Sequence, residues 1–125
     1  LPRAKGDPRE LQQVFINLLV NSVHAIDAAV RQGRTGTHHI SLSVTDRVGQ
    51  PDRWQIAVTD TGCGIPEANL AHIFKPFFTT KDIGQGTGLG LATTFRFVDA
   101  WNGTIRVESQ EGVGTTFFVS LLKAR

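Results

Sequence analysis

The chain of 125 residues is poor in several features, and each shortage excludes a class of protein. It has one cysteine, Cys63, which excludes an internal disulfide and a metal site of several cysteines and favours a reducing compartment. No apolar run of membrane-spanning length and no signal peptide is visible. The 13 basic residues form no run and the net charge is only +2, so a nucleic-acid-binding face has little support. Because methionine is absent even at the first position, we expect a piece of a longer protein.

Glycine, by contrast, is abundant, with 13 residues in a chain that is 40% hydrophobic. This composition predicts one globular domain with a two-layer core and a loop that needs unusual backbone freedom. The stretch "GQGTGLGLATTF" (84–95) has glycine at four alternate positions and then apolar residues at helical spacing. Glycines at the start of a helix let the backbone approach a ligand closely, often a phosphate. The stretch matches neither the Walker loop nor the dinucleotide fingerprint, and a flexible connector is the alternative.

The hydrophobic pattern predicts an α/β sandwich in which helices cover one face of a mostly antiparallel sheet. A long first helix is capped by Asp7, has Pro8 in its first turn and ends at Gly33. A short helix over 67–73 should follow, and then another over 88–101, with Phe95 facing inward and with Asn102-Gly103 ending the helix. The predicted strands are 39–46, which should be half-buried, 54–60, 104–110 and 115–122, and the last two should form a hairpin around "EGVG". The stretch 47–53 is predicted as a turn and 74–87 as a mobile loop.

Two asparagines, Asn17 and Asn21, lie one turn apart on the first helix and therefore point the same way. Asparagine is a poor helix former and is costly to bury without a partner. Either residue alone could be a satisfied core or surface asparagine. As a pair that faces a glycine-rich loop, they are better explained by a ligand, because amide oxygens suit Mg²⁺ that also binds substrate phosphates.

The segment "DTGCGIP" begins with Asp60 at the end of a predicted strand. Its aspartate could simply close a turn by accepting a hydrogen bond from its own backbone. Alternatively, a carboxylate at the floor of a pocket would select a ligand amino group, because it only accepts hydrogen bonds. Gly62 and Gly64 would then let a flat ring lie close to the chain.

The segment "IFKPFFTTK" contains Phe77 and Phe78. These rings could belong to the core. Beside Pro76 and two threonines they could instead form the hinge and anchor of a lid over a bound ligand.

Five motifs, "NLLVNSVHA", "DTGCGIP", "FKPFFTTK", "GQGTGLGL" and "GVGTTF", stand in the order seen in the ATP-binding domain of sensor histidine kinases. The chain resembles this family over roughly residues 7–122, and so also resembles the superfamily of gyrase, heat-shock chaperone and mismatch-repair ATPases. The resemblance implies their two-layer α/β sandwich (the Bergerat-type ATP-binding fold), with ATP and Mg²⁺ as cofactors. It also implies that the alternate glycines belong to an ATP lid.

The resemblance implies a role for each matching residue. Asn21 supplies an oxygen to Mg²⁺, with Asn17 alongside, and Lys81 is the lid cation, so these three are the expected catalytic residues. Asp60 accepts from the adenine amino group, and Thr115 supports it from a neighbouring strand. The other nucleotide-binding positions are His24 near phosphate, Gly62, Gly64 and Ile65 around the base, and Gly86, Thr87, Gly88, Leu89 and Gly90 at the lid. His24 could alternatively be an ordinary surface histidine, and Lys81 could be an ordinary solvated lysine.

The residue at position 17 separates two subclasses. The resemblance implies that relatives which hydrolyse ATP have at the matching position a glutamate that activates water. The amide of Asn17 cannot take a proton at neutral pH. This favours transfer of the γ-phosphoryl group to another side chain. An ATPase fragment and a non-catalytic nucleotide-sensing module are the alternatives.

The resemblance also implies that the phosphoacceptor histidine lies on a helical hairpin and is followed by Glu or Asp, and no histidine of this chain is followed by either residue. We therefore expect the acceptor on a separate dimerisation domain of a parent sensor kinase, with a response regulator downstream. We expect this domain to be cytoplasmic, without nucleic-acid or direct membrane contact, even if the parent is anchored in the inner membrane. The lid segment resembles that of the nitrogen- and dicarboxylate-sensing kinases.

Overall fold

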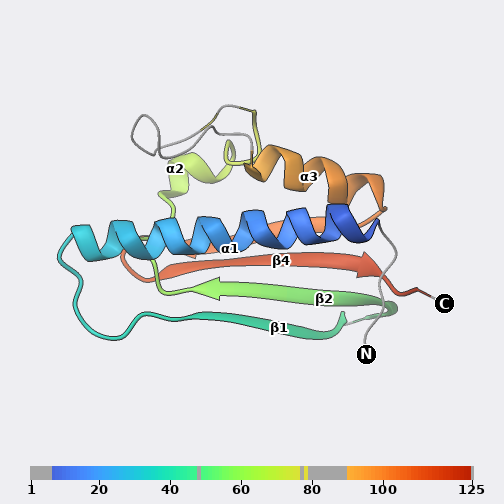
Figure 1. Ribbon diagram of the computed structural model, residues 1–125, viewed down its shortest axis with the longest axis horizontal. Helices are drawn as coiled ribbons and strands as arrows, with labels where there is room; N and C mark the ends of the chain where they lie inside the picture. The colour runs from blue at the N-terminus through green and yellow to red at the C-terminus, as the bar shows by residue number, and fades with distance from the viewer. Residues whose placement is uncertain (1–6, 48, 77, 79–89, 125) are drawn as a thin grey trace.

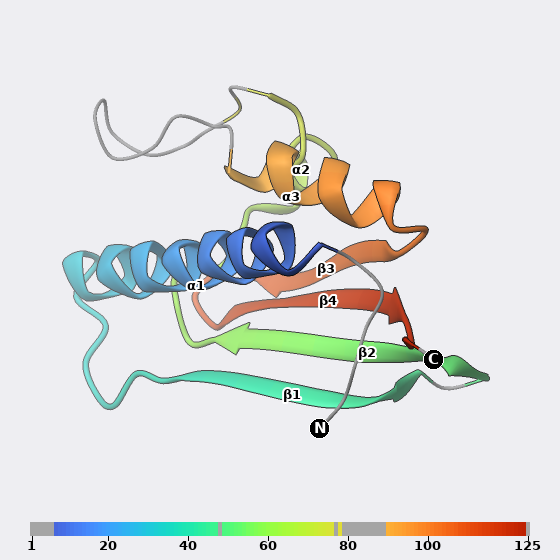
Figure 2. The same ribbon diagram turned by 45° about the vertical axis from the view of Figure 1, so that its right-hand side comes forward.

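A computed structural model describes residues 7–47, 49–76, 78 and 90–124, and its helices cover one face of a four-stranded sheet (Figures 1 and 2). The sheet has the order β1-β2-β4-β3, and each neighbouring pair is antiparallel. This confirms the predicted sandwich. The elements are α1 (Pro8–Arg31), β1 (Ile40–Arg47), β2 (Gln50–Asp60), α2 (Glu67–Leu70), α3 (Gly90–Ala100), β3 (Thr104–Gln110) and β4 (Gly114–Leu122).

The ends of α1 follow from local sequence. The Asp7 side chain accepts a hydrogen bond from the Arg9 N–H at 2.8 Å, and Pro8 occupies the first turn. The helix ends at Arg31, and Gly33 follows with φ +89°. By length and composition α1 could also span a membrane, which we did not expect from the sequence. Here its apolar side packs on the sheet instead, where Val14 and Leu18 have no exposed surface.

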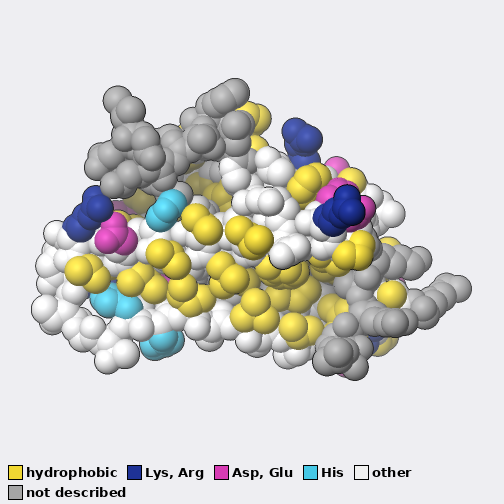
Figure 3. All heavy atoms as spheres, viewed as in Figure 1, with side chains coloured by type: hydrophobic (Ala, Val, Ile, Leu, Met, Phe, Trp, Pro, Cys, Tyr) yellow, Lys and Arg dark blue, Asp and Glu magenta, His cyan; other side chains and the backbone are white. Residues whose placement is uncertain are grey.

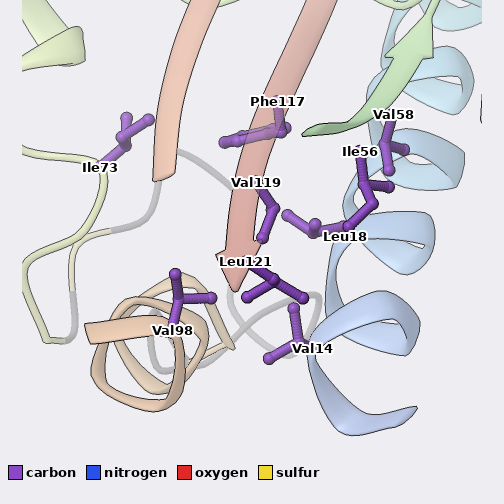
Figure 4. Close-up of a cluster of buried hydrophobic side chains, with 9 residues drawn as sticks. All are labelled: Val14, Leu18, Ile56, Val58, Ile73, Val98, Phe117, Val119 and Leu121. Atoms are coloured by element: carbon purple, nitrogen blue, oxygen red, sulfur yellow. The ribbon is translucent and has the colours of Figure 1, made fainter. Parts of the chain in front are cut away.

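The core lies between the helices and the sheet (Figure 4). Alternate residues of β4 face it, as expected of a strand with one buried side. α3 contributes Val98 and ends where Asn102 adopts φ +58°, as the Asn-Gly stop predicts. The buried hydrophobic residues of this cluster are Val14, Leu18, Ile56, Val58, Ile73, Val98, Phe117, Val119 and Leu121.

The first strand differs from the prediction. β1 is an edge strand, and none of its residues is buried, with Leu42 at 50% and Val44 at 41% exposure. These side chains and those of α1 residues Leu11 and Phe15 line an open apolar trough of about 280 Å³. Apolar side chains spread along this side of the molecule (Figure 3). Alternation predicted burial on one face, but among the described residues no helix lies over β1 closely enough to bury it.

Three smaller expectations were also wrong. The polar stretch 47–53 was predicted as a turn, but β1 runs to Arg47 and β2 begins at Gln50 because cross-strand pairing extends into it. The short helix is a single turn, Glu67–Leu70, rather than 67–73. Phe95 was predicted to face inward but is 43% exposed, and its ring packs beside Phe74 at a centroid distance of 5.7 Å.

Candidate functional site

The floor of the candidate site is the carboxyl end of β2. Asp60 is the last residue of this strand, is 4% exposed, and lies opposite Thr115 of β4. Its Oδ1 accepts a hydrogen bond from the Gly62 N–H at 2.8 Å. Burial raises the pKa of Asp60, and this effect is opposed by the Gly62 N–H, by the nearby Ser22 hydroxyl and Thr115 backbone, and by the positive charge of Arg34. Oδ1 of Asp60 closes the turn after β2, as the first interpretation predicts. This bond does not exclude the second interpretation, in which the carboxylate also accepts a hydrogen bond from a ligand.

Thr115 is also 4% exposed, and its hydroxyl shares a hydrogen bond of 2.8 Å with the Ser109 hydroxyl. Ser109 accepts from the Ile65 N–H at 2.8 Å, so the loop after β2 is tied to the β3–β4 hairpin. The structure thus brings Asp60, Ile65 and Thr115 together, as the resemblance implied.

Contacts within the chain already require glycine at positions 62 and 64. A β-carbon on Gly62 would lie 2.5 Å from the Ala25 β-carbon of α1. Gly64 has φ +76°, and its β-carbon would lie 2.2 Å from the Gln110 carbonyl oxygen. Their lack of a side chain lets the loop pack against α1 and against the β3–β4 turn. Room for a flat ring is not required to explain either glycine.

The two asparagines of the predicted site lie one turn apart on α1. Asn17 Nδ2 donates to the Gly90 carbonyl at 3.1 Å and to Thr94 Oγ1 at 3.4 Å, while Asn17 Oδ1 accepts from Gln13 Nε2 at 2.8 Å. Gly90 is the last of the four alternating glycines, so α1 contacts the end of the glycine-rich stretch that the structure describes. Asn21 is half-buried on the same side, one turn further along.

Much of the predicted lid lies outside the described residues. This applies to Phe77 and to the predicted site residues Lys81, Gly86, Thr87, Gly88 and Leu89. Of the described part, Phe74 and Phe78 are half-buried and pack against the core, and the Phe78 ring lies 6.0 Å from the His72 ring. His24 is half-buried on α1.

Three residues that sequence reasoning did not select contact the site. Ser22 is 1% exposed; its hydroxyl makes no hydrogen bond of ordinary geometry to any described residue, yet it lowers the pKa of Asp60. Thr94 Oγ1 accepts a hydrogen bond from Asn17 Nδ2, and the Arg34 guanidinium donates to two backbone carbonyls of the loop after Asp60. A polar residue within the apolar side of α1 was the available signal for Ser22. The contacts of Arg34 and Thr94 are long-range and leave no local signal.

The residues at the candidate site suit a metal ion that takes most of its ligands from water and from a substrate. Among the described residues, no three or more His, Cys, Asp or Glu side chains are grouped so that they could hold a metal ion. The carboxamides of Asn17 and Asn21, one turn apart, offer hard oxygen ligands instead. Such a pair fits Mg²⁺, which keeps several waters and takes further oxygens from substrate phosphates.

Comparison with known proteins places this geometry in a family. Residues 6–125 match the family of histidine kinase-, DNA gyrase B- and HSP90-like ATPases. The chain belongs to this family. It is 43% identical over 121 residues to the sensor histidine kinase ZraS of Salmonella typhimurium, covering 97% of this chain and 23% of ZraS. It is 34% identical to sporulation kinase E of Bacillus subtilis, covering 97% of this chain and 15% of that kinase. The chain is thus an ATP-binding domain of the sensor histidine kinase type, as the resemblance implied.

Solved structures of histidine kinases share the fold. Full-length ShkA in complex with AMPPNP superposes with a TM-score of 0.79 at 28% identity, covering 99% of this chain and 24% of ShkA. The nucleotide-free catalytic domain of the histidine kinase ThkA superposes with a TM-score of 0.72 at 32% identity, covering 96% of this chain and 70% of that one. The chain therefore spans less than a quarter of ZraS and of ShkA, and most of each relative lies outside the match.

Proposed function

We propose that this chain binds Mg-ATP and donates the γ-phosphoryl group to a histidine on a separate dimerisation domain of a parent sensor kinase. The observation that carries the proposal is the amide at position 17. Asn17 is anchored to the start of α3, and its carboxamide has no proton-accepting capacity at neutral pH. A water molecule beside it would not be activated, so a side chain of the acceptor domain takes the phosphoryl group.

At the base end of the site, Asp60 accepts the hydrogen bond of the adenine amino group. Its buried position supports this role, because a buried carboxylate gains most from a donor that fits it. Thr115 lies directly opposite in the β2–β4 register and positions the carboxylate. Ile65 packs near the ring, and Gly62 and Gly64 fix the path of the loop that borders it.

At the phosphate end, Asn21 provides the main protein oxygen for Mg²⁺, with Asn17 beside it. Asn17 Oδ1 accepts from Gln13 Nε2 at 2.8 Å, which leaves one of its two lone pairs for a metal. When bound, Mg²⁺ supplies positive charge that neutralises the phosphates. His24 and Lys81 add cationic or donor groups, and residues 86–90 (Gly86, Thr87, Gly88, Leu89 and Gly90) bring the backbone close to the phosphates at the start of α3.

The partners follow from this division of labour. The acceptor histidine belongs to a dimerisation domain of the parent, and a response regulator takes the phosphoryl group from it. We place the domain in the cytoplasm, where ATP is available, whether or not the parent is anchored in the inner membrane. The lid segment "FKPFFTTK" supports a parent of the nitrogen- and dicarboxylate-sensing subgroup.

The test combines the chain with the purified dimerisation domain of its parent and γ-labelled ATP. We expect an acid-labile phosphate on the dimerisation domain, and none when its acceptor histidine is replaced by alanine. Steady phosphate release by this chain alone would contradict the proposal and indicate an ATPase. ATP binding without either product would contradict it as well, and would leave a nucleotide-sensing module.

A further inference from the structure

We propose that Arg34 is a positioning residue for adenine recognition, because its guanidinium holds the peptide group that fixes the direction of the Asp60 carboxylate. This inference rests on the proposed role of Asp60. Arg34 lies in the connection between α1 and β1, remote in sequence from the loop after β2. Its guanidinium donates to the carbonyl of Thr61 at 2.8 Å through Nη2 and to the carbonyl of Gly62 through Nη1.

The first of these contacts continues directly to Asp60. The Thr61 carbonyl and the Gly62 N–H belong to one planar peptide group, so they cannot turn independently. Arg34 holds the carbonyl side of this group at 2.8 Å, and Asp60 Oδ1 accepts from its N–H side, also at 2.8 Å. The peptide group therefore transmits the position of the guanidinium to the carboxylate.

The second contact fixes the next peptide group in the same manner. Arg34 donates to the Gly62 carbonyl, while the Cys63 N–H of that group donates to the Ala25 carbonyl at 2.9 Å. Both peptide groups that flank Gly62 are thus held at both ends. Gly62 has no side chain to restrict its backbone, so these external bonds are what fix its conformation.

The same connection supports Thr61 from another side. The His39 N–H donates to Thr61 Oγ1 at 3.2 Å, and His38 Nδ1 lies 3.0 Å from the same oxygen. Residues 34–39 therefore hold the loop after β2 through polar contacts that do not involve the hydrophobic core. Because Oδ1 is engaged by the Gly62 N–H, the orientation of the whole carboxylate depends on this peptide group. This makes Arg34 a determinant of selectivity for adenine rather than of phosphate binding.

The test measures affinity for ADP and for inosine diphosphate, which lacks the amino group that Asp60 would bind. Arg34→Gln should weaken ADP binding about tenfold, the loss expected for a hydrogen bond involving a charged group, and should leave inosine diphosphate binding nearly unchanged. Arg34→Lys keeps the charge but replaces the planar guanidinium, which reaches both carbonyls, by a single ammonium nitrogen, and its effect should fall between those of the parent and Arg34→Gln. Arg31→Gln, three residues earlier and paired with exposed Asp27, is the matched control and should behave as the parent.

Two outcomes would overturn the inference. One is an equal loss of both ligands in Arg34→Gln, which indicates a general structural role. The other is an unchanged preference for ADP. The backbone amide resonance of Gly62 gives an independent readout, because it should shift in Arg34→Lys if the peptide group turns, even if Arg34→Gln fails to fold. Asp60→Ala separates the two proposals. If Asp60→Ala keeps the preference for ADP, the proposed role of Asp60 is wrong, whereas loss there with no effect at Arg34 rejects only this inference.

Discussion

The two ends of the proposed nucleotide site are built differently. At the base end, Asp60 and Thr115 are both 4% exposed, lie opposite each other on adjacent strands, and bond to neighbouring backbone or hydroxyl groups. At the phosphate end, Asn17 and Asn21 are only half-buried, and Asn17 reaches α3 through side-chain bonds of 3.1 and 3.4 Å. Burial and strand register fix the first end, whereas two helices and a few side chains define the second.

This difference indicates a division of tasks. A buried carboxylate held by backbone groups can recognise a base with little rearrangement, because its geometry exists before the ligand arrives. Half-buried amides on a helix can exchange their protein partners for a metal and phosphates. Four predictions break or sharpen this comparison.

The largest effect should come from Asn21→Ala at the phosphate end. Loss of a metal-ligand oxygen should reduce ATP affinity about a hundredfold in the presence of Mg²⁺, with the fold intact. Calorimetry with Mg²⁺ and with EDTA measures this, and the loss should disappear in EDTA. Asn69→Ala on α2 is the matched control. Unchanged Mg-ATP binding by the Asn21 variant would remove this residue from the metal site.

Asp60→Asn should weaken ATP binding by about 1–3 kcal/mol, the cost of a mispaired buried group. The amide presents a donor or a weaker acceptor where the adenine amino group needs an acceptor, so the preference for ATP over GTP should fall. Competition binding measures that ratio, with Asp99→Asn on the exposed face of α3 as control. A variant that discriminates as well as the parent would show that the base does not meet Asp60.

Gly62 at the base end and Gly90 at the phosphate end should differ in their roles, the first supporting the stability of the fold and the second supporting ATP binding. Gly62→Ala places a β-carbon 2.5 Å from that of Ala25 and should reduce the free energy of unfolding by about 1–3 kcal/mol. A β-carbon on Gly90 would lie 3.8 Å from the nearest atom of Asn17, an ordinary contact. Gly90→Ala should therefore leave urea unfolding unchanged and weaken ATP binding. Equal stability of both variants would mean that the base end is not as closely packed as the contacts indicate.

The smallest effect concerns stability of the nucleotide-free chain against pH. Burial raises the pKa of Asp60 above its unfolded value, so between those two pKa values the native state binds more protons than the unfolded state. The contribution of Asp60 is therefore lost as pH rises through the native pKa. Asp60→Asn should melt at a slightly higher temperature than the parent at neutral pH, and the difference should shrink in acid. Asp99→Asn should show no such trend, and a parallel pH profile of the Asp60 variant and the parent would contradict the assignment.

Sequence reasoning performed well where the determinants are local. The cap at Asp7, the stop at Asn102 and the β3–β4 hairpin all depend on residues within a few positions of each other. It failed for β1 and for Phe95, because burial depends on which element lies over a side chain and not on the side chain alone. For the site, the sequence indicated Asn17, Asp60 and Thr115 but not that Asn17 is bonded to Gly90.

The sequence by itself determined the order of helices and strands, the polar residues set into them and the family to which the chain belongs. Those properties arise from periodicity, capping and motif order, which are written along the chain. Only the tertiary structure decided that Arg34 reaches the loop after Asp60, that Gly62 must accommodate Ala25, and that Asp60 is buried opposite Thr115. These contacts join residues far apart in the chain, and their geometry is set by the β2–β4 register and by how α1 and the connection after it pack against the sheet.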